Sequence, residues 1–219
     1  ALIRAGYDVF RLNVRDHGPG LHLDPYALNR GFFMGTLFDE VFAATQQVAA
    51  LAGNAPLYIV GPSLGGNFAL RLALRHRREP VAHLERVIVF NPVLDPFLSA
   101  QALDQNPLYL RYFRRRWLAS LRAKARIFPE LYDFSALETI PRLIPMTDAL
   151  LDRYGAQVGN FRDARAYFDG YRIDPTDLAE LTVPTTVISS ANDRVVPVST
   201  IRALAPPACL NVQIYASGG

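Results

Sequence analysis

The chain carries at residues 57 to 67 the stretch Leu57-Tyr-Ile-Val-Gly-Pro-Ser-Leu-Gly-Gly-Asn67, in which a short apolar run meets a helical run through a G-x-S-x-G pentad. Four successive apolar residues are typical of a strand buried in a parallel sheet. A strand that turns sharply into a helix needs small residues at the turn, so we expect a side chain at Gly61 or Gly65 to collide with neighbouring backbone. Such a turn holds Ser63 out over the edge of the sheet, which makes Ser63 a candidate nucleophile.

The residues on either side of the pentad are needed to interpret it. Composition alone supplies such a pentad in about one chain in fourteen of this length. Here the pentad lies between the apolar run and a segment in which Phe68, Leu70 and Leu72 continue as a helix. We therefore interpret it as a nucleophile elbow rather than as a plain glycine-rich turn.

Strand-like and helical runs alternate along the chain. The strand-like runs are residues 7–14, 57–61, 86–91, 184–190 and 210–216. Helical runs at 36–52 and 64–77 separate the first three of them. This alternation predicts the α/β class, with a mostly parallel sheet that has helices on both faces.

A long segment between Asn91 and Pro184 is rich in Leu, Arg, Tyr and Phe and shows no strand alternation. It is too long for an ordinary crossover connection. We interpret residues 94–171 as a helical cap that is inserted within a single domain spanning residues 1–219.

The clearest helix of this cap is expected at residues 107–126. Apolar residues recur on one side at spacings of three and four: Leu110, Phe113, Trp117, Leu121 and Ala125. Arginines lie mainly on the other side: Arg111, Arg114, Arg115, Arg122 and Arg126. Two interpretations stay open, namely a solvated face that covers its own aliphatic stems and a basic rim that attracts anionic substrates or lipid headgroups.

Composition excludes several classes of protein. Half of the 219 residues are hydrophobic and 20% are charged, which indicates a folded domain with a core. The formal charge of +3 rests almost wholly on arginine, with Lys124 as the single lysine, and we expect no nucleic-acid partner. No apolar stretch reaches the roughly 18 residues that span a bilayer, so no integral membrane segment is expected. The single cysteine, Cys209, excludes an internal disulfide and favours a reducing, cytoplasmic compartment.

Other kinds of site lack a signature in the sequence. The histidines and the cysteine do not have the spacing of metal ligands, and no glycine-rich phosphate loop is present. We therefore expect neither a metal nor a cofactor.

A nucleophilic serine needs a base to take its proton, and the base needs an acid to orient it. The acid is predicted at Asp193, because residues 185–190 form an apolar run that leads into a polar loop carrying this carboxylate. Loops at the carboxyl ends of parallel strands open on the same edge as the elbow. Two alternatives stay open: Asp193 as a turn or helix-capping residue, and Asp95, which follows an earlier strand, as the acid.

The base is the difficulty. The four histidines are His17, His22, His76 and His83, and none lies after the predicted acid, where the usual chain order places the base. His76 ends the elbow helix and His83 lies at the amino end of a strand, so we expect both to be structural. His17 follows a strand at its carboxyl end, and we expect a loop or pocket-wall position, with a functional contact as the alternative.

Three segments together resemble the α/β-hydrolase superfamily, and most closely its YheT-like branch. Residues 12–18 resemble the strand-to-loop segment upstream of the elbow, residues 61–67 the elbow and residues 190–197 the acid loop. In such proteins the catalytic histidine follows the last strand, just after small residues similar to Ala216-Ser-Gly-Gly219, and a His-Gly loop supplies half of the oxyanion hole. The resemblance implies that the domain is incomplete, that both elements lie outside these residues and that this fragment alone shows little activity.

The resemblance also implies the chemistry. Ser63 would be the nucleophile, the Leu64 backbone N–H one oxyanion donor, and Asp193 the acid that orients the absent histidine. The expected activity is a serine hydrolase that cleaves carboxylic esters, a small-molecule acyl substrate, through an acyl-enzyme intermediate. Alternatives on the same scaffold are a non-catalytic binding protein, an acyltransferase or a thioesterase. Weak surface association through the arginine-rich cap is a further prediction.

Overall fold

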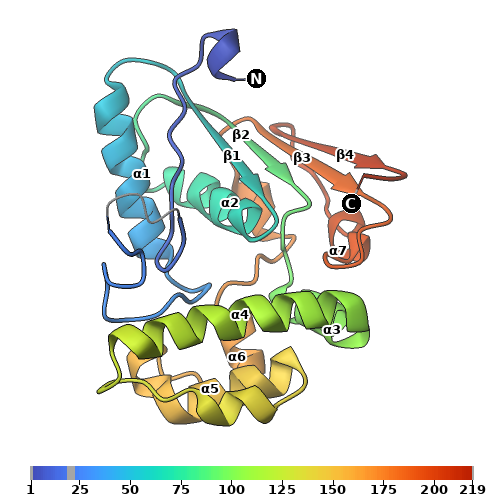
Figure 1. Cartoon of the computed structure of the whole chain (residues 1–219). Helices are drawn as coiled ribbons and strands as arrows, with labels where there is room; N and C mark the ends of the chain where they lie inside the picture. Colours follow the sequence, from blue (N-terminus) through green and yellow to red (C-terminus); the bar gives the residue numbers. More distant parts are fainter. Residues whose placement is uncertain (1, 19–22, 219) are drawn as a thin grey trace.

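A parallel sheet forms the centre of the structure, and its strands lie side by side in chain order (Figure 1). The computed structural model describes residues 2–18 and 23–218. In these ranges the strands are β1 (Leu57–Pro62), β2 (Leu84–Phe90), β3 (Thr185–Ser190) and β4 (Leu210–Tyr215). Every neighbouring pair is parallel. The predicted α/β class with a mostly parallel sheet is therefore confirmed.

The helices next to the sheet follow the expected alternation. The helical elements of this part are η1 (Ile3–Ala5), α1 (Phe38–Ala52), α2 (Leu64–His76), η3 (Asp177–Glu180) and α7 (Val198–Arg202). The predicted helical runs 36–52 and 64–77 thus agree with α1 and α2 to within two residues. Asp39 and Glu40 lie in the first turn of α1, where carboxylates favour the positive end of the helix dipole.

The described helices cover one face of the sheet, not both. Side chains of alternate strand positions, such as Val87, Val89 and Val187, are fully buried in a cluster that also contains residues of α1 and α2. Tyr58 and Val60, on the opposite face, are 44% and 52% exposed. The prediction of helices on both faces is therefore wrong for the described residues.

The predicted first strand, residues 7–14, is also wrong. These residues are extended but belong to no ladder, and residues 7–13 are exposed. The contact of this segment with the edge strand is the side-chain pair Tyr7–Tyr58, with ring centroids 6.1 Å apart. A strand exists only where a neighbour accepts and donates its backbone hydrogen bonds, and the described residues supply no such neighbour here.

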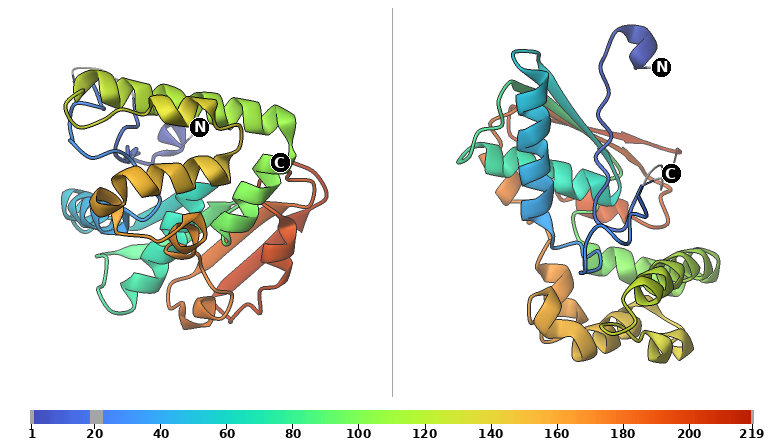
Figure 2. Two further views of the ribbon diagram at one scale, coloured as in Figure 1. Left: turned by 90° about the horizontal axis from the view of Figure 1, so that it is seen from below. Right: turned by 60° about the vertical axis from the view of Figure 1, so that its left-hand side comes forward.

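The chain between the end of β2 and the start of β3 forms a second layer, which is made of helices. The elements are α3 (Pro96–Gln105), α4 (Pro107–Ile127), η2 (Ser135–Thr139), α5 (Leu143–Val158) and α6 (Ala164–Asp169). Capping side chains start three of them: Asp95, Asn106 and Asp163 each accept a backbone N–H of the first turn. Figures 1 and 2 show this helical layer as a body of its own beside the sheet. It has its own buried cluster, which includes Phe32 and Met34 from the loop before α1.

Candidate functional site

Ser63 occupies a strained turn between β1 and α2. Its backbone has φ 52° and ψ −121°, a conformation that is uncommon for any residue other than glycine. Hydrogen bonds hold the turn from both sides: the Ser63 N–H donates to Phe90 O at 2.8 Å, and Ser63 O accepts from Gly66 N at 2.9 Å. Strain of this kind persists where the surroundings over-determine the backbone, and it is concentrated at functional sites.

The glycines of the turn are not equally constrained. A Cβ at Gly61 would lie 2.4 Å from Gly65 O, so no other residue fits there without movement of the backbone. A Cβ at Gly65 would meet only Pro62 Cδ, at 3.5 Å, which is an ordinary contact. A Cβ at Gly66 would lie 2.9 Å from Pro92 Cβ. The predicted collision is therefore correct for Gly61 and wrong for Gly65, and the second close approach is at Gly66.

The groups around the serine hydroxyl are free to meet a ligand. Ser63 is exposed, and among the described residues no hydrogen bond engages its Oγ. The first N–H groups of α2, at Leu64 and Gly65, likewise have no acceptor in the described part of the chain. Unsatisfied N–H groups at a helix N-terminus favour an anion. The Leu64 N–H, one residue after the exposed hydroxyl, is thus open to a ligand.

Asp193 lies in the loop after β3. Its Oδ1 accepts the N–H groups of Val195 and Val196, at 2.7 and 2.9 Å. These bonds fix the carboxylate in the loop, as the turn-capping interpretation expects. Its Oδ2 has no partner among the described residues, so this oxygen can accept a ring N–H as well.

Asp95, the alternative acid, is engaged in structural contacts. Its Oδ1 caps α3 by accepting Leu98 N at 2.9 Å, and its Oδ2 lies 3.4 Å from Arg172 Nε. Both carboxylate oxygens therefore have partners, which favours Asp193 for the orienting role.

The carboxyl ends of β2, β3 and β4 are tied together at the edge on which the elbow opens. Asn91, with φ 41°, accepts the Ser190 N–H on its Oδ1 at 2.8 Å. A Cβ at Gly218 would lie 3.3 Å from Ser190 Oγ, so the segment after β4 returns to the end of β3. Asn91 was not predicted as a site residue, and its single sequence signal is its position directly after a buried strand.

No described histidine bonds to the candidate nucleophile or acid. His17 is exposed, contacts the Arg15 carbonyl through Nδ1 at 2.8 Å and packs against Phe33. The Nδ1 of His76 accepts Val81 N at 3.0 Å, which is a structural role. His83 is exposed, with φ 55°, next to the amino end of β2. His22 lies outside the described residues.

Asn67 joins the sheet layer to the helical layer. Its side chain is fully buried. Its Nδ2 donates to Val93 O at 2.9 Å and to Tyr171 O at 2.8 Å. These carbonyls lie at the two crossings between the layers, which we call the neck. A residue four positions after Ser63 thus holds both sides of the neck.

A buried ion pair makes a second connection between the layers. Lys124 Nζ, on α4, lies 2.6 Å from Asp16 Oδ1, and the side chains are 0% and 2% exposed. The same ammonium donates to Tyr26 O and Asn29 O, both at 2.7 Å. A charge in such a place is stable only when it is paired and hydrogen-bonded. One feature of the sequence could have pointed to this residue: Lys124 is the single lysine in a chain whose other basic side chains, histidines apart, are all arginine.

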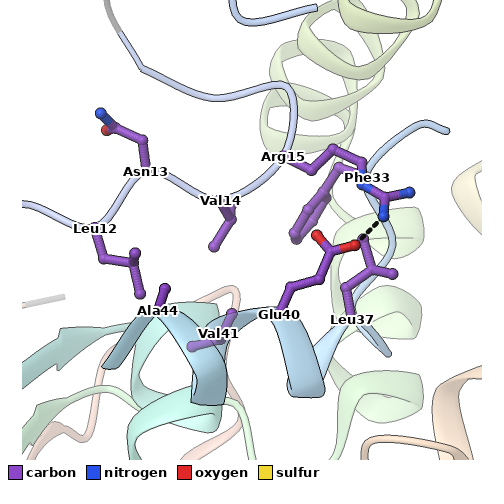
Figure 3. Close-up of a pocket in the computed structure, with 9 residues that line it drawn as sticks. All are labelled: Leu12, Asn13, Val14, Arg15, Phe33, Leu37, Glu40, Val41 and Ala44. Carbon is purple, nitrogen blue, oxygen red and sulfur yellow. Dashed lines mark hydrogen bonds and ion pairs between the residues drawn. The ribbon is translucent and has the colours of Figure 1, made fainter. Parts of the chain in front are cut away.

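The cavities near these connections do not include the elbow. One, of about 190 Å³, lies between the extended N-terminal segment and α1 (Figure 3). Its lining residues are Leu12, Asn13, Val14, Arg15, Phe33, Leu37, Glu40, Val41 and Ala44. The Arg15–Glu40 ion pair spans one end of it. A second, of about 220 Å³, is lined by Asp95 and Arg172 among others. Neither is lined by Ser63 or Asp193.

The architecture contains no helix, within the described residues, that is long and apolar enough to cross a membrane.

Solved structures of several hydrolases are similar to this chain at low identity. A serine hydrolase from the polyaromatic hydrocarbon-degrading bacterium Cycloclasticus zankles is 15% identical over 83% of this chain and 63% of its own, with a TM-score of 0.47. A meta-cleavage product hydrolase from Pseudomonas fluorescens is 15% identical over 84% and 64%, with a TM-score of 0.47. The monoacylglycerol lipase of Paleococcus ferrophilus is 17% identical over 83% and 66%, with a TM-score of 0.43. The chain spans less than two thirds of each of these proteins.

Comparison at the level of families gives a match over nearly the whole sequence. No curated protein matches the chain. The family described as serine aminopeptidase S33 matches residues 1–213. The YheT-like branch is not part of this result and stays a prediction. Since the match leaves out only the last residues, the chain belongs to the serine aminopeptidase S33 family of α/β hydrolases.

Proposed function

We propose that the protein is a serine hydrolase that cleaves carboxylic esters through an acyl-enzyme intermediate, with Ser63 as its nucleophile. The observation that supports this most directly is the conformation of Ser63. The parallel strand β1 and the helix α2 hold it at φ 52°, with an exposed hydroxyl and two unpaired N–H groups beside it. A plain structural turn has no need of this strain.

The proposed reaction assigns a role to each group. Ser63 Oγ attacks the acyl carbonyl, and a histidine takes its proton and passes it to the leaving alcohol. The Leu64 N–H donates to the oxyanion of the tetrahedral intermediate. Asp193 keeps the histidine in the correct tautomer through Oδ2, while the backbone holds Oδ1. Water then releases the acid from the Ser63 ester by the reverse proton transfers.

The histidine of this triad is proposed to belong to a part of the protein outside the 219 residues. It would approach along the edge where Gly218 returns to the end of β3. Residues 94–171 are proposed as a cap over the site. The proposed substrates are esters of small or medium acyl groups. For the compartment, we propose the cytoplasm, since a single unpaired cysteine suits a reducing environment.

A non-catalytic binding protein is the second candidate. The observation that favours it is that no described histidine contacts Ser63 or Asp193. An acyltransferase or a thioesterase would use the same nucleophile and oxyanion donor, and substrate panels separate these from an esterase.

Labelling of the full-length protein with a fluorophosphonate tests the proposal. An activated serine labels, whereas a binding protein does not. We expect Ser63→Ala to abolish labelling and to lower ester turnover about a million-fold. We expect Ser199→Ala, at an exposed serine on α7, to leave both unchanged.

The acid is tested in the same assay. Asp193→Asn should lower turnover by about four orders of magnitude, as expected when the histidine loses its orienting carboxylate. Asp95→Asn should leave it nearly unchanged. Full labelling of Ser63→Ala would refute the assignment of the nucleophile, and a reversed order of the two aspartate variants would refute that of the acid.

A further inference from the structure

The first half of α4 presents a surface of exposed apolar and arginine side chains. We call it the α4 surface, and it consists of Leu108, Arg111, Tyr112, Phe113, Arg115 and Arg116. Leu108 is 76% exposed, Tyr112 60% and Phe113 37%. Spacings of three and four residues bring these side chains to neighbouring positions on the helix. Figure 2, left, shows α4 along one edge of the molecule.

The arginines of α4 fall into two groups. Arg114 donates to the carbonyls of Ile140 and Glu138, and Arg122 forms two 2.7 Å hydrogen bonds with the Glu138 carboxylate. These two arginines therefore hold η2 against α4. For Arg111, Arg115, Arg116 and, at the far end of the helix, Arg126, in contrast, no ion pair or hydrogen bond exists within the described residues.

The carboxylates of the two neighbouring elements, α3 and η2, already have partners. Asp104, on α3, accepts the N–H groups of Leu143 and Ile144 and so caps α5. Glu138 is paired with Arg122. The α4 surface consequently keeps its positive charge, on a chain whose formal charge is +3.

The helix that carries this surface is well anchored at its other end. Leu118 and Leu121 are buried there, and Lys124 is locked to Asp16. The surface is therefore presented on a fixed element, so little ordering is required when it binds.

We propose that the α4 surface binds anionic lipid bilayers. Tyr and Phe side chains insert favourably into the interface between lipid headgroups and acyl chains. Arginine stems extend along apolar surface while their guanidinium groups reach lipid phosphates. A nucleic-acid backbone would satisfy the arginines but leave Leu108 and Phe113 without apolar contacts. This proposal does not depend on the proposed hydrolytic activity.

Flotation with lipid vesicles tests it. The full-length protein is mixed with vesicles of phosphatidylcholine alone or with about one third phosphatidylserine. We expect binding to the anionic vesicles alone, with a decrease as salt rises. Each basic side chain near such a surface contributes about a fivefold change in affinity. Arg115→Glu/Arg116→Glu should therefore weaken binding at least about 25-fold.

The control is a variant with the same change in net charge at another place. Arg78→Glu/Arg202→Glu changes two exposed arginines, one after α2 and one on α7. It should lower affinity far less than the α4 variant. Leu108→Ser/Tyr112→Ser should weaken binding without any change in charge. Equal losses in the two charge variants, or no binding of the wild type, would overturn the proposal, as would unchanged binding of the serine variant together with tight binding to a DNA duplex.

Discussion

Replacement of Lys124 by methionine should destabilise the protein severely. The Lys124 ammonium has three partners at 2.6 to 2.7 Å, namely the Asp16 carboxylate and two backbone carbonyls. Methionine has a similar length and volume, so the cavity term stays small. What remains is an unpaired carboxylate in a site where the side chain is 2% exposed. Removal of one partner of a buried ion pair costs about 3–5 kcal/mol.

That loss is a large part of the stability of a typical domain, which is about 5–15 kcal/mol. Urea unfolding, followed by the fluorescence of Trp117 on the same helix, measures it. Arg126→Met, at an exposed position two residues further along α4, is the control and should change stability by less than about 0.5 kcal/mol.

The ion pair is isolated by a double-mutant cycle with Asp16→Asn. Asparagine suits this position because the residue has φ 63° and because an amide oxygen can still accept the Phe33 N–H. Asp16→Asn/Lys124→Met leaves neither charge unpaired. It should cost about 1–3 kcal/mol less than the sum of the single variants. A loss below 1 kcal/mol for Lys124→Met, or strict additivity in the cycle, would show that the buried pair does not connect the two layers.

Two further predictions concern the neck and the helical layer. Asn67→Leu keeps the side-chain volume but leaves the two neck carbonyls without a hydrogen-bond donor, and each unsatisfied carbonyl should cost about 1–3 kcal/mol of stability. Limited proteolysis should therefore cut the neck faster than in the wild type, and an unchanged rate of cleavage would contradict this. The hydrogen bond from Arg122 is the main cause of a pKa of Glu138 below its ordinary value of 4.5. The stabilisation of the folded state by this ionised carboxylate is complete above pH 4.5 and is lost as the pH falls through the lowered pKa. Glu138→Gln should therefore reduce the difference in urea midpoint between pH 7 and pH 3, and an unchanged difference would contradict it.

Local patterns predicted most of the elements correctly. The apolar run at residues 57–61 is β1, and the spacing of apolar residues at 107–126 agrees with α4 to within one residue. Such patterns depend on neighbours within a few positions in the chain, which the sequence contains in full. Residues 7–14 are the exception. They have the pattern of a strand, but a strand also requires a partner with a free edge, and that is a property of the assembled sheet.

The features of the candidate site also divide into those that local sequence predicted and those that depend on distant residues. The G-x-S-x-G spacing was enough to place Ser63 between a strand and a helix, because glycine is needed wherever backbones approach closely. Which glycine is crowded, Gly66 rather than Gly65, depends on Pro92, a residue of another segment. Spacing likewise predicted an arginine face on α4, but only tertiary contacts divide it into structural and free arginines.

The sequence by itself therefore determined the α/β class, the turn at Ser63 and the chemical types of its candidate partners. Three features were decided by tertiary structure alone. Asp95 caps helix α3 and pairs with Arg172, Asn67 hydrogen-bonds to both sides of the neck, and Lys124 is buried against Asp16. The physical reason is that propensity and periodicity act over a few residues, whereas the pairing of a charge or an amide depends on groups that lie far apart in the chain and meet only on folding.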